Sequence, residues 1–110
     1  FVAVLVEGRE GLANFNEIAQ VDGLDLIYLG LYDISQALGV PGQVDHPQVE
    51  EHLRQCVKAC QDSGKLLGTI ASDFESAKHF QQLGINFIAY VADSFALGTF
   101  FRDFHRRVSR

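Results

Sequence analysis

The stretch D-L-I-Y-L-G-L-Y-D-I-S-Q-A-L-G, Asp25–Gly39, decides the fold class of this chain. Its first part, Asp25–Leu29, is a short and mainly apolar run of the kind that forms a strand. Its second part predicts a short helix over Ile34–Leu38, with Asp33 as a favoured N-cap and Gly39 as the residue that ends the helix. A strand followed at once by a helix is the building unit of parallel α/β proteins.

The same order of strand and helix repeats along the chain. The predicted strands are Val2–Val6, Asp25–Leu29, Leu66–Ile70 and Asn86–Val91. The predicted helices are Asn14–Gln20, Ile34–Leu38, Pro47–Ser63, a segment from Ser72 to Leu83 and a final segment from Asp93 onward. Uninterrupted apolar runs such as Val2–Val6 predict strands buried on both faces. Four βα units with right-handed crossovers predict one α/β domain, residues 1–110, with a parallel sheet covered by helices. The pattern fits a small flavodoxin-like sheet or half of an eight-stranded βα barrel.

The last two helices carry patterns that predict how each helix packs. Ser72 and Glu75 have the spacing of a capping box at a helix start. Three residues of the helix that follows are predicted to face the sheet: Phe74, Ala77 and Phe80. The final helix has an apolar stripe that suits either this chain's own sheet or a neighbouring subunit: Leu97, Phe100, Phe101, Phe104 and Val108. Its basic strip predicts a solvated face or a subunit contact: Arg102, Arg106 and Arg110.

Composition argues against several kinds of partner. The chain has 110 residues and a net charge of −5, which disfavours nucleic acid because phosphate binding needs a basic surface. It has no apolar run of about 18 residues, so we expect no transmembrane helix and no membrane partner. It contains no methionine and opens inside a strand-like run. From this we expect a piece of a longer polypeptide, with a processed N-terminus as the alternative.

Cys56 and Cys60 are the only cysteines, and both lie on the predicted helix Pro47–Ser63. They belong to an apolar stripe typical of a helix that faces a core: Val49, Leu53, Cys56, Val57 and Cys60. Two buried thiols predict a reducing compartment, and we expect the chain to be cytoplasmic. A zinc site is the alternative, but it needs two further ligands and the helix offers only His52.

Glu7 and Asp33 are the candidate metal ligands. Glu7 closes the first predicted strand, and Asp33 follows shortly after the second. Because the carboxyl ends of neighbouring parallel strands lie at one edge of the sheet, we expect the two carboxylates close together. Such a pair suits a hard divalent cation, Mg²⁺ or Mn²⁺. The alternative is that Glu7 is solvated and Asp33 only caps a helix.

The backbone near these carboxylates can hold an anionic ligand. Gly30 lacks a side chain, so a small ligand can approach the chain closely there. The N–H groups at the start of the next helix favour a carboxylate group. A cation beside such amides suits a 2-oxo acid, with the metal at the keto oxygen and the amides at the carboxylate.

Four segments of the chain resemble one known family. They are V-E-G-R-E-G-L-A-N-F-N-E-I-A (residues 6–19), G-L-Y-D-I-S-Q-A-L-G-V-P-G-Q-V-D-H-P-Q-V (residues 30–49), G-K-L-L-G (residues 64–68) and L-G-I-N-F-I-A (residues 83–89). In order and spacing they are similar to the HpcH/HpaI aldolase family, which is related to the citrate lyase β subunit. The resemblance implies a metal-dependent (class II) aldolase with a βα barrel. Such an enzyme makes or breaks a carbon–carbon bond beside pyruvate or a related 2-oxo acid.

The resemblance also implies roles for individual residues. Glu7 and Asp33 match the family's two metal ligands. The backbone at Gly30, Tyr32 and Asp33 matches the segment that holds the pyruvate carboxylate. The chain corresponds to the second half of the barrel, strands five to eight. The implied partners are a 2-oxo acid, an aldehyde and further copies of the subunit in a homo-oligomer.

The chain departs from the family pattern in ways that affect the site. Leu31 stands where the family has proline, which is expected to loosen the turn. Leu5 stands where many of the aldolases have a glutamine that bonds to substrate. The family's catalytic histidine base and pyruvate-binding arginine belong to the first half of the barrel, so no catalytic residue is assigned here. These departures leave an alternative function: an inactive family member that serves as a scaffold or oligomerisation module.

Overall fold

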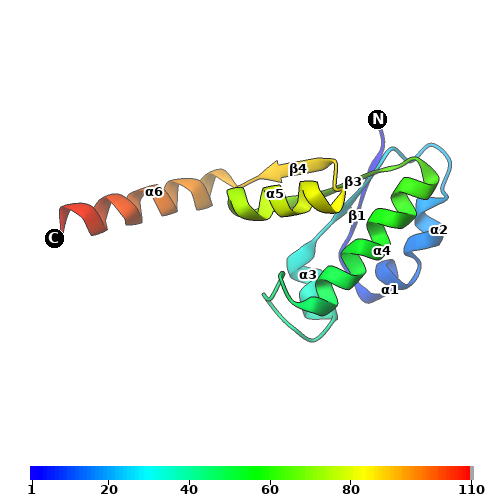
Figure 1. The fold of residues 1–110 in the computed structure, drawn as a ribbon, viewed down its shortest axis with the longest axis horizontal. Coiled ribbons are helices and arrows are strands. Elements are labelled where there is room, and N and C mark those ends of the chain that lie inside the picture. The colour runs from blue at the N-terminus through cyan, green and yellow to red at the C-terminus, as the bar shows by residue number, and fades with distance from the viewer. Residues whose placement is uncertain (110) are drawn as a thin grey trace.

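The computed structural model describes residues 1–109, in which strands and helices alternate along the chain (Figure 1). The strands are β1 (Ala3–Val6), β2 (Leu26–Leu29), β3 (Leu66–Ala71) and β4 (Phe87–Tyr90). The helices are α1 (Arg9–Ala13), α2 (Phe15–Ala19), α3 (Leu31–Ala37), α4 (Pro47–Ser63), α5 (Phe74–Leu83) and α6 (Asp93–Val108). The predicted α/β class with four βα units is confirmed, and α1 is a helix that the sequence pattern missed. Arg110, from the predicted basic strip, lies outside the described residues.

The four strands form one parallel sheet with the order β1-β2-β3-β4. Each strand pairs with the next one along the chain, and Val6 lies opposite Leu29 in the first pair. A flavodoxin-like sheet has a switch point at which the strand order reverses, whereas the strands of a βα barrel follow one another around the sheet. The sequential order therefore supports the barrel and contradicts the flavodoxin-like alternative. In the described part of the chain, β1 and β4 are the edges of the sheet.

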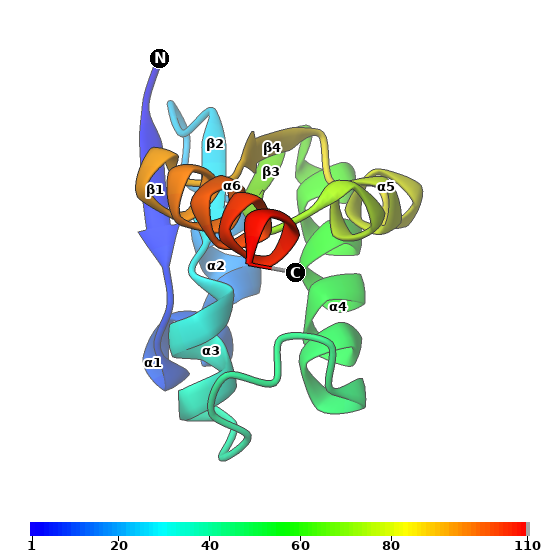
Figure 2. The same cartoon turned by 90° about the vertical axis from the view of Figure 1, so that its left-hand side faces the viewer.

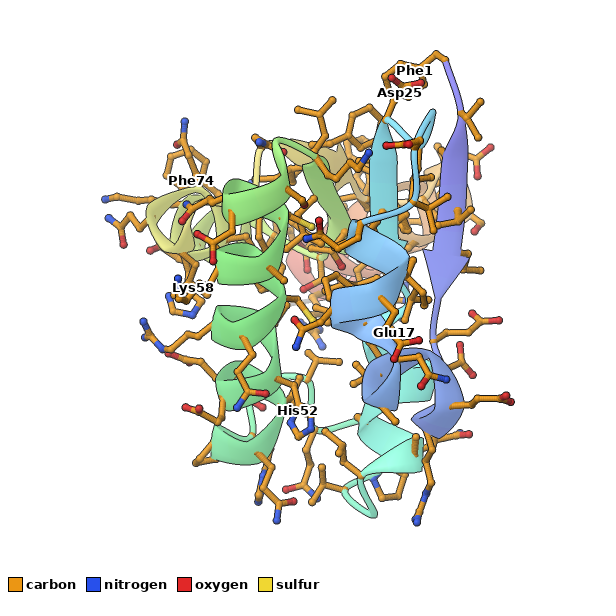
Figure 3. All side chains as sticks on the ribbon, turned by 90° about the vertical axis from the view of Figure 1, so that its right-hand side faces the viewer. Phe1, Glu17, Asp25, His52, Lys58 and Phe74 are labelled. Carbon is orange, nitrogen blue, oxygen red and sulfur yellow. The ribbon has the colours of Figure 1, made fainter. Side chains whose placement is uncertain are left out.

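The helices that precede α6 cover one face of this sheet, and the core lies between the two layers. α4 and α5 pack on β3, and α2 lies beside α4 (Figure 3). The strand side chains on the covered face are buried: Val6, Ile27, Leu29, Leu67, Thr69 and Ala71. On the other face, Leu5 and Phe87 are 55% and 45% exposed. Burial on both faces of the first strand was predicted and is wrong, because β1 is an edge strand that buries only Val6.

Local sequence signals set both ends of α4. His46 is its N-cap and accepts a hydrogen bond from the Gln48 N–H (3.2 Å), and Pro47 occupies the first helical position. The apolar stripe of this helix is buried against the sheet. The helix ends at Gly64, whose φ of 69° is a left-handed conformation that glycine adopts without strain. The predicted bounds of this helix are therefore confirmed.

Cys56 and Cys60 are free thiols on the buried side of α4. Burial raises the pKa of the Cys56 thiol to about 12 and that of the Cys60 thiol to about 11, so both stay protonated at neutral pH. His52 contacts the Gln48 carbonyl through Nδ1 (2.8 Å). The prediction of two buried cysteines is confirmed.

The predicted capping box of Ser72 and Glu75 would make Ser72 the N-cap of α5, but the helix starts one residue later. Its N-cap is Asp73, which accepts a hydrogen bond from the Ser76 N–H (2.8 Å), while the Ser76 hydroxyl accepts one from the Asp73 N–H (3.2 Å). The hydrogen bonds from Ser76 lower the pKa of the Asp73 carboxyl from its usual value. Phe74, the first residue of the helix, is 67% exposed, while Phe80 is buried. The predicted packing of Phe74 on the sheet is therefore wrong.

α6 projects away from the sheet and gives the described chain a longest dimension of 56 Å (Figure 1, Figure 2). None of its residues is buried. Its apolar side chains are exposed: Phe95, Leu97, Phe100, Phe101, Phe104 and Val108. The prediction that this stripe packs on the chain's own sheet is therefore wrong. The prediction that it contacts a neighbouring subunit stays a prediction. Among residues 1–109, no helix combines the length and apolar character needed to cross a membrane.

Replacing Ile27 tests where the core lies. Ile27 is fully buried in β2, so Ile27→Ala is expected to lower the free energy of unfolding by about 2 to 5 kcal/mol. Phe74→Ala is the control, because it removes a larger but exposed side chain and is expected to change the free energy by less than about 0.5 kcal/mol. Urea unfolding followed by circular dichroism measures both. Equal losses in the two variants would contradict the outward position of Phe74.

Candidate active site

Glu7 directly follows β1 and lies at the carboxyl-terminal edge of the sheet. It shares with Leu5 the sheet face that no helix covers, and the pairing of β1 with β2 brings it beside Gly30. A Cβ atom on Gly30 would lie 2.8 Å from the Glu7 Cβ and 2.9 Å from the Glu7 Oε2. Both distances are shorter than van der Waals contact. The Glu7 side chain therefore occupies the space that any side chain at position 30 would need.

Asp33 is the third residue of α3, and its side chain is exposed. The helix begins at Leu31, with Gly30 as its N-cap and no side-chain hydrogen bond at the cap. The predictions that the helix begins at Ile34 and that Asp33 caps it are therefore wrong. The helix begins earlier because Leu31 is anchored in the core, where it is 2% exposed. The alternative role of Asp33 as a helix cap is thereby removed.

Glu7 and Asp33 both offer carboxylate oxygens, the ligand type that hard divalent cations prefer. In the described part of the chain, neither Glu7 nor Asp33 belongs to an ion pair. Mg²⁺ is commonly bound through one or two carboxylates, with water and substrate oxygens completing its octahedron. Within residues 1–109, no three or more His, Cys, Asp or Glu side chains are placed together to hold a metal ion. A cation held by Glu7 and Asp33 would therefore need further ligands from water or substrate.

The first turn of α3 presents backbone N–H groups next to the carboxylates. Its first intrahelical hydrogen bond runs from the Ile34 N–H to the Gly30 carbonyl (2.9 Å). The N–H groups of Leu31, Tyr32 and Asp33 precede that bond and have no partner within the helix. Leu31 was expected to loosen this turn, but the turn closes as a regular helix. A looser turn than in relatives with proline stays a prediction.

A cavity of about 280 Å³ opens at the same edge of the sheet, beside the first turn of α3. Its lining is mostly apolar and includes Leu31, Tyr32, Val44, Ile70, Phe80 and Phe95. Glu7 and Asp33 do not line it, so the cavity and the carboxylate pair are neighbouring features connected through Leu31 and Tyr32. Because its walls come from several separate elements, no local sequence pattern pointed to it.

Two residues near this edge were missed by the sequence pattern. Val91 follows β4 and lines the cavity with a φ of 58°, a left-handed conformation that a β-branched residue rarely adopts. Ser35 is fully buried in α3. A polar residue among the apolar positions of a short helix, next to Ile34, is the signal that could have identified Ser35.

Sequential parallel βα units, with acidic residues after the first two strands, define a βα-barrel protein with a candidate cation site. The family model described as HpcH/HpaI aldolase/citrate lyase matches residues 1–98. This chain belongs to the HpcH/HpaI aldolase/citrate lyase family, as the resemblance of its four segments predicted.

Curated relatives match the chain over a part of their length. The hydroxypyruvate/pyruvate aldolase of Pseudomonas aeruginosa is 35% identical over 91 residues, which are 83% of this chain and 34% of the relative. The 4-hydroxy-2-oxo-heptane-1,7-dioate aldolase of Escherichia coli is 32% identical over 93 residues, which are 84% of this chain and 36% of the relative. The chain thus spans about a third of the length of these curated relatives.

Solved structures contain the same arrangement of strands and helices. The HpcH/HpaI aldolase from Desulfitobacterium hafniense DCB-2 matches all of this chain and 43% of its own, with a TM-score of 0.90 and 22% identity. An HpcH/HpaI aldolase/citrate lyase family protein from Burkholderia cenocepacia J2315 matches 99% of this chain and 42% of its own, with a TM-score of 0.92 and 28% identity. The four βα units therefore form part of the larger βα barrel of this family.

Gly30→Ala tests the contact between Glu7 and Gly30. The added Cβ would displace the Glu7 carboxylate. Affinity for Mn²⁺, measured by isothermal titration calorimetry, is therefore expected to fall about tenfold or more, as it does when a ligand loses its orientation. Gly8→Ala is the control, because a Cβ on Gly8 meets no atom within 4 Å. Unchanged affinity in Gly30→Ala would show that cation binding does not depend on this position of Glu7.

Proposed function

We propose that this chain is the metal-binding half of a class II aldolase, strands five to eight of its barrel, and that Glu7 and Asp33 bind Mg²⁺ or Mn²⁺. One observation carries the proposal. Glu7 lies against Gly30, which begins the turn that carries Asp33, at the carboxyl-terminal edge of the sheet. Enzymes with βα barrels build their active sites at this end of the strands.

The substrate that suits this turn is a 2-oxo acid, joined to or released from an aldehyde. The N–H groups of Tyr32 and Asp33 have no partner within the helix and would hold its carboxylate. A bound cation supplies Lewis-acid polarisation of the keto group. Two of the relatives are named for hydroxypyruvate, pyruvate and a 4-hydroxy-2-oxo dicarboxylate, which supports this substrate class.

The proton transfer of an aldol reaction needs a base, and we assign it to a residue outside this chain. His46 caps α4, and His52 contacts the Gln48 carbonyl. His79 lies 3.4 Å from Glu50 on the outer helices. His105 lies on α6, which projects away from the sheet. None of these four histidines is therefore assigned as the base.

Leu5 distinguishes the proposed site from that of the related aldolases. Its Cδ1 lies 3.7 Å from where a Cβ on Gly30 would be, on the same face as Glu7. An apolar side chain in this position gives the substrate no hydrogen bond. We therefore propose a substrate preference that differs from that of relatives with a glutamine there.

The exposed apolar stripe of α6 favours a second candidate function, a scaffold or oligomerisation module. Six large apolar side chains on one solvent-exposed helix suit contact with another subunit. A homo-oligomer is compatible with either function, and the free buried thiols suit a cytoplasmic location.

Added Mn²⁺ is expected to stabilise the folded chain, because a ligand that binds only the native state shifts the unfolding equilibrium. At a free concentration of about 100 times Kd the gain is about 2.7 kcal/mol, seen as a rise in Tm by calorimetry. The double variant Glu7→Gln, Asp33→Asn is expected to lose this rise. Glu17→Gln, which removes an exposed carboxylate on α2, is the control (Figure 3). A Tm that responds to neither Mn²⁺ nor Mg²⁺ would refute the metal role.

Retro-aldol cleavage distinguishes the aldolase from the scaffold. We expect a polypeptide that joins this chain to the base to release pyruvate from a 4-hydroxy-2-oxo acid. The release should depend on Mn²⁺ and be lost in Asp33→Asn, with lactate dehydrogenase and NADH reporting the pyruvate. The 110-residue chain alone is expected to bind Mn²⁺ without turnover. Metal binding with no turnover in the longer polypeptide would favour the scaffold.

A further inference from the structure

Ser35 has a hydroxyl whose hydrogen bonds all lie inside the protein. The Ser35 side chain is 0% exposed, and Thr69 is the other buried polar residue of the described chain with this value. The Ser35 hydroxyl donates to the Tyr32 carbonyl (2.6 Å) and accepts from the Gly42 N–H (2.9 Å). A buried hydroxyl that both donates and accepts holds its two partners at a defined separation.

These bonds join the first turn of α3 to the loop between α3 and α4. The Tyr32 carbonyl belongs to the turn, and Gly42 belongs to the loop. The Ser35 carbonyl also accepts from the Val40 N–H (2.9 Å), so two loop amides are bound by one residue. The same loop continues to Val44, which lines the cavity. Ser35 therefore connects the turn that carries a candidate metal ligand with a wall of the cavity.

We propose that Ser35 is a positioning residue for the cation site, because it holds the turn that presents Asp33. The inference rests on the proposed function of Glu7 and Asp33 as metal ligands. α3 has seven residues and no side-chain cap, and so short a helix depends on tertiary contacts for its position. Without the hydroxyl, the Gly42 N–H loses its partner, and the loop or the turn must move to find another. Ser35 contacts neither carboxylate, so its effect on a cation runs through the backbone of this turn.

The test compares Ser35→Ala with Ser63→Ala in the full chain. Ser63 is a matched control: its hydroxyl is part-buried and donates to the Ala59 carbonyl (2.8 Å), but it lies at the end of α4, just before β3 begins. Both variants lose a hydroxyl that donates to a helical carbonyl, but Ser35→Ala also leaves the Gly42 N–H without its acceptor. The fall in Tm is therefore expected to be larger in Ser35→Ala than in Ser63→Ala. Ser35→Ala is expected to weaken Mn²⁺ binding about tenfold in calorimetric titration, the effect typical of losing a residue that orients a metal ligand. Ser63→Ala is expected to leave Mn²⁺ affinity within about twofold of wild type, a change of under about 0.5 kcal/mol.

Ser35→Thr is the rescue variant, because a threonine hydroxyl in a helix can bond the same carbonyl. It should recover most of the Mn²⁺ affinity. If Ser35→Ala does not fold, Ser35→Cys gives the same comparison, since a thiol keeps the volume but is a weak donor and acceptor. A lowered Tm with unchanged Mn²⁺ affinity in the Ser35 variants would overturn the positioning role alone. Absence of Mn²⁺ binding in the wild-type chain would instead overturn the proposed function, and the positioning role with it.

Discussion

The hydrogen bond from the Gly30 N–H to the Val6 carbonyl (3.0 Å) is the constraint on which the edge of the sheet depends. The last residue pair of β1 and β2 is Val6 with Leu29. This hydrogen bond continues the pairing by one residue and so places Glu7 beside Gly30. Side chains alternate between the faces of a strand, so a slip of one residue would turn Glu7 toward the helices. Backbone pairing thus places the carboxylate, and the missing side chain at Gly30 gives it room.

The two faces of the sheet differ in what covers them. The covered face holds the apolar core. The uncovered face carries a row that the register aligns across all four strands: Leu5, Tyr28, Gly68 and Phe87. The rings of Tyr28 and Phe87 meet edge to face across Gly68, with centroids 6.3 Å apart. A Cβ on Gly68 would lie 2.9 Å from the Tyr28 ring, so glycine permits this contact. Partial burial in this row raises the pKa of Tyr28. In a βα barrel, side chains on this face of the strands fill the interior.

Features set by neighbours in the chain were predictable, whereas features set by tertiary packing were not. Pro47 and Gly64 bound α4 through φ preferences that act on single residues, and both ends of that helix were predicted. The start of α3 was not, because it depends on the burial of Leu31 among residues far away in the sequence. Likewise, the apolar face of α6 was recognisable as a stripe, but its exposure follows from where the helix leaves the sheet. For the site, the strand-end positions of Glu7 and Asp33 were predictable, while the cavity and the bonds of Ser35 need the fold.

The leucine at position 31 changes the hydrogen-bonding capacity of the proposed ligand-binding turn. The family that this chain resembles has proline at the corresponding position. Proline has no N–H and contributes only ring carbons there. Leu31 anchors the turn through its buried side chain and keeps its amide hydrogen. This chain therefore has three N–H donors ahead of the first helical bond where a proline-bearing relative has two. The replacement increases the number of N–H protons that the turn can offer to an anion.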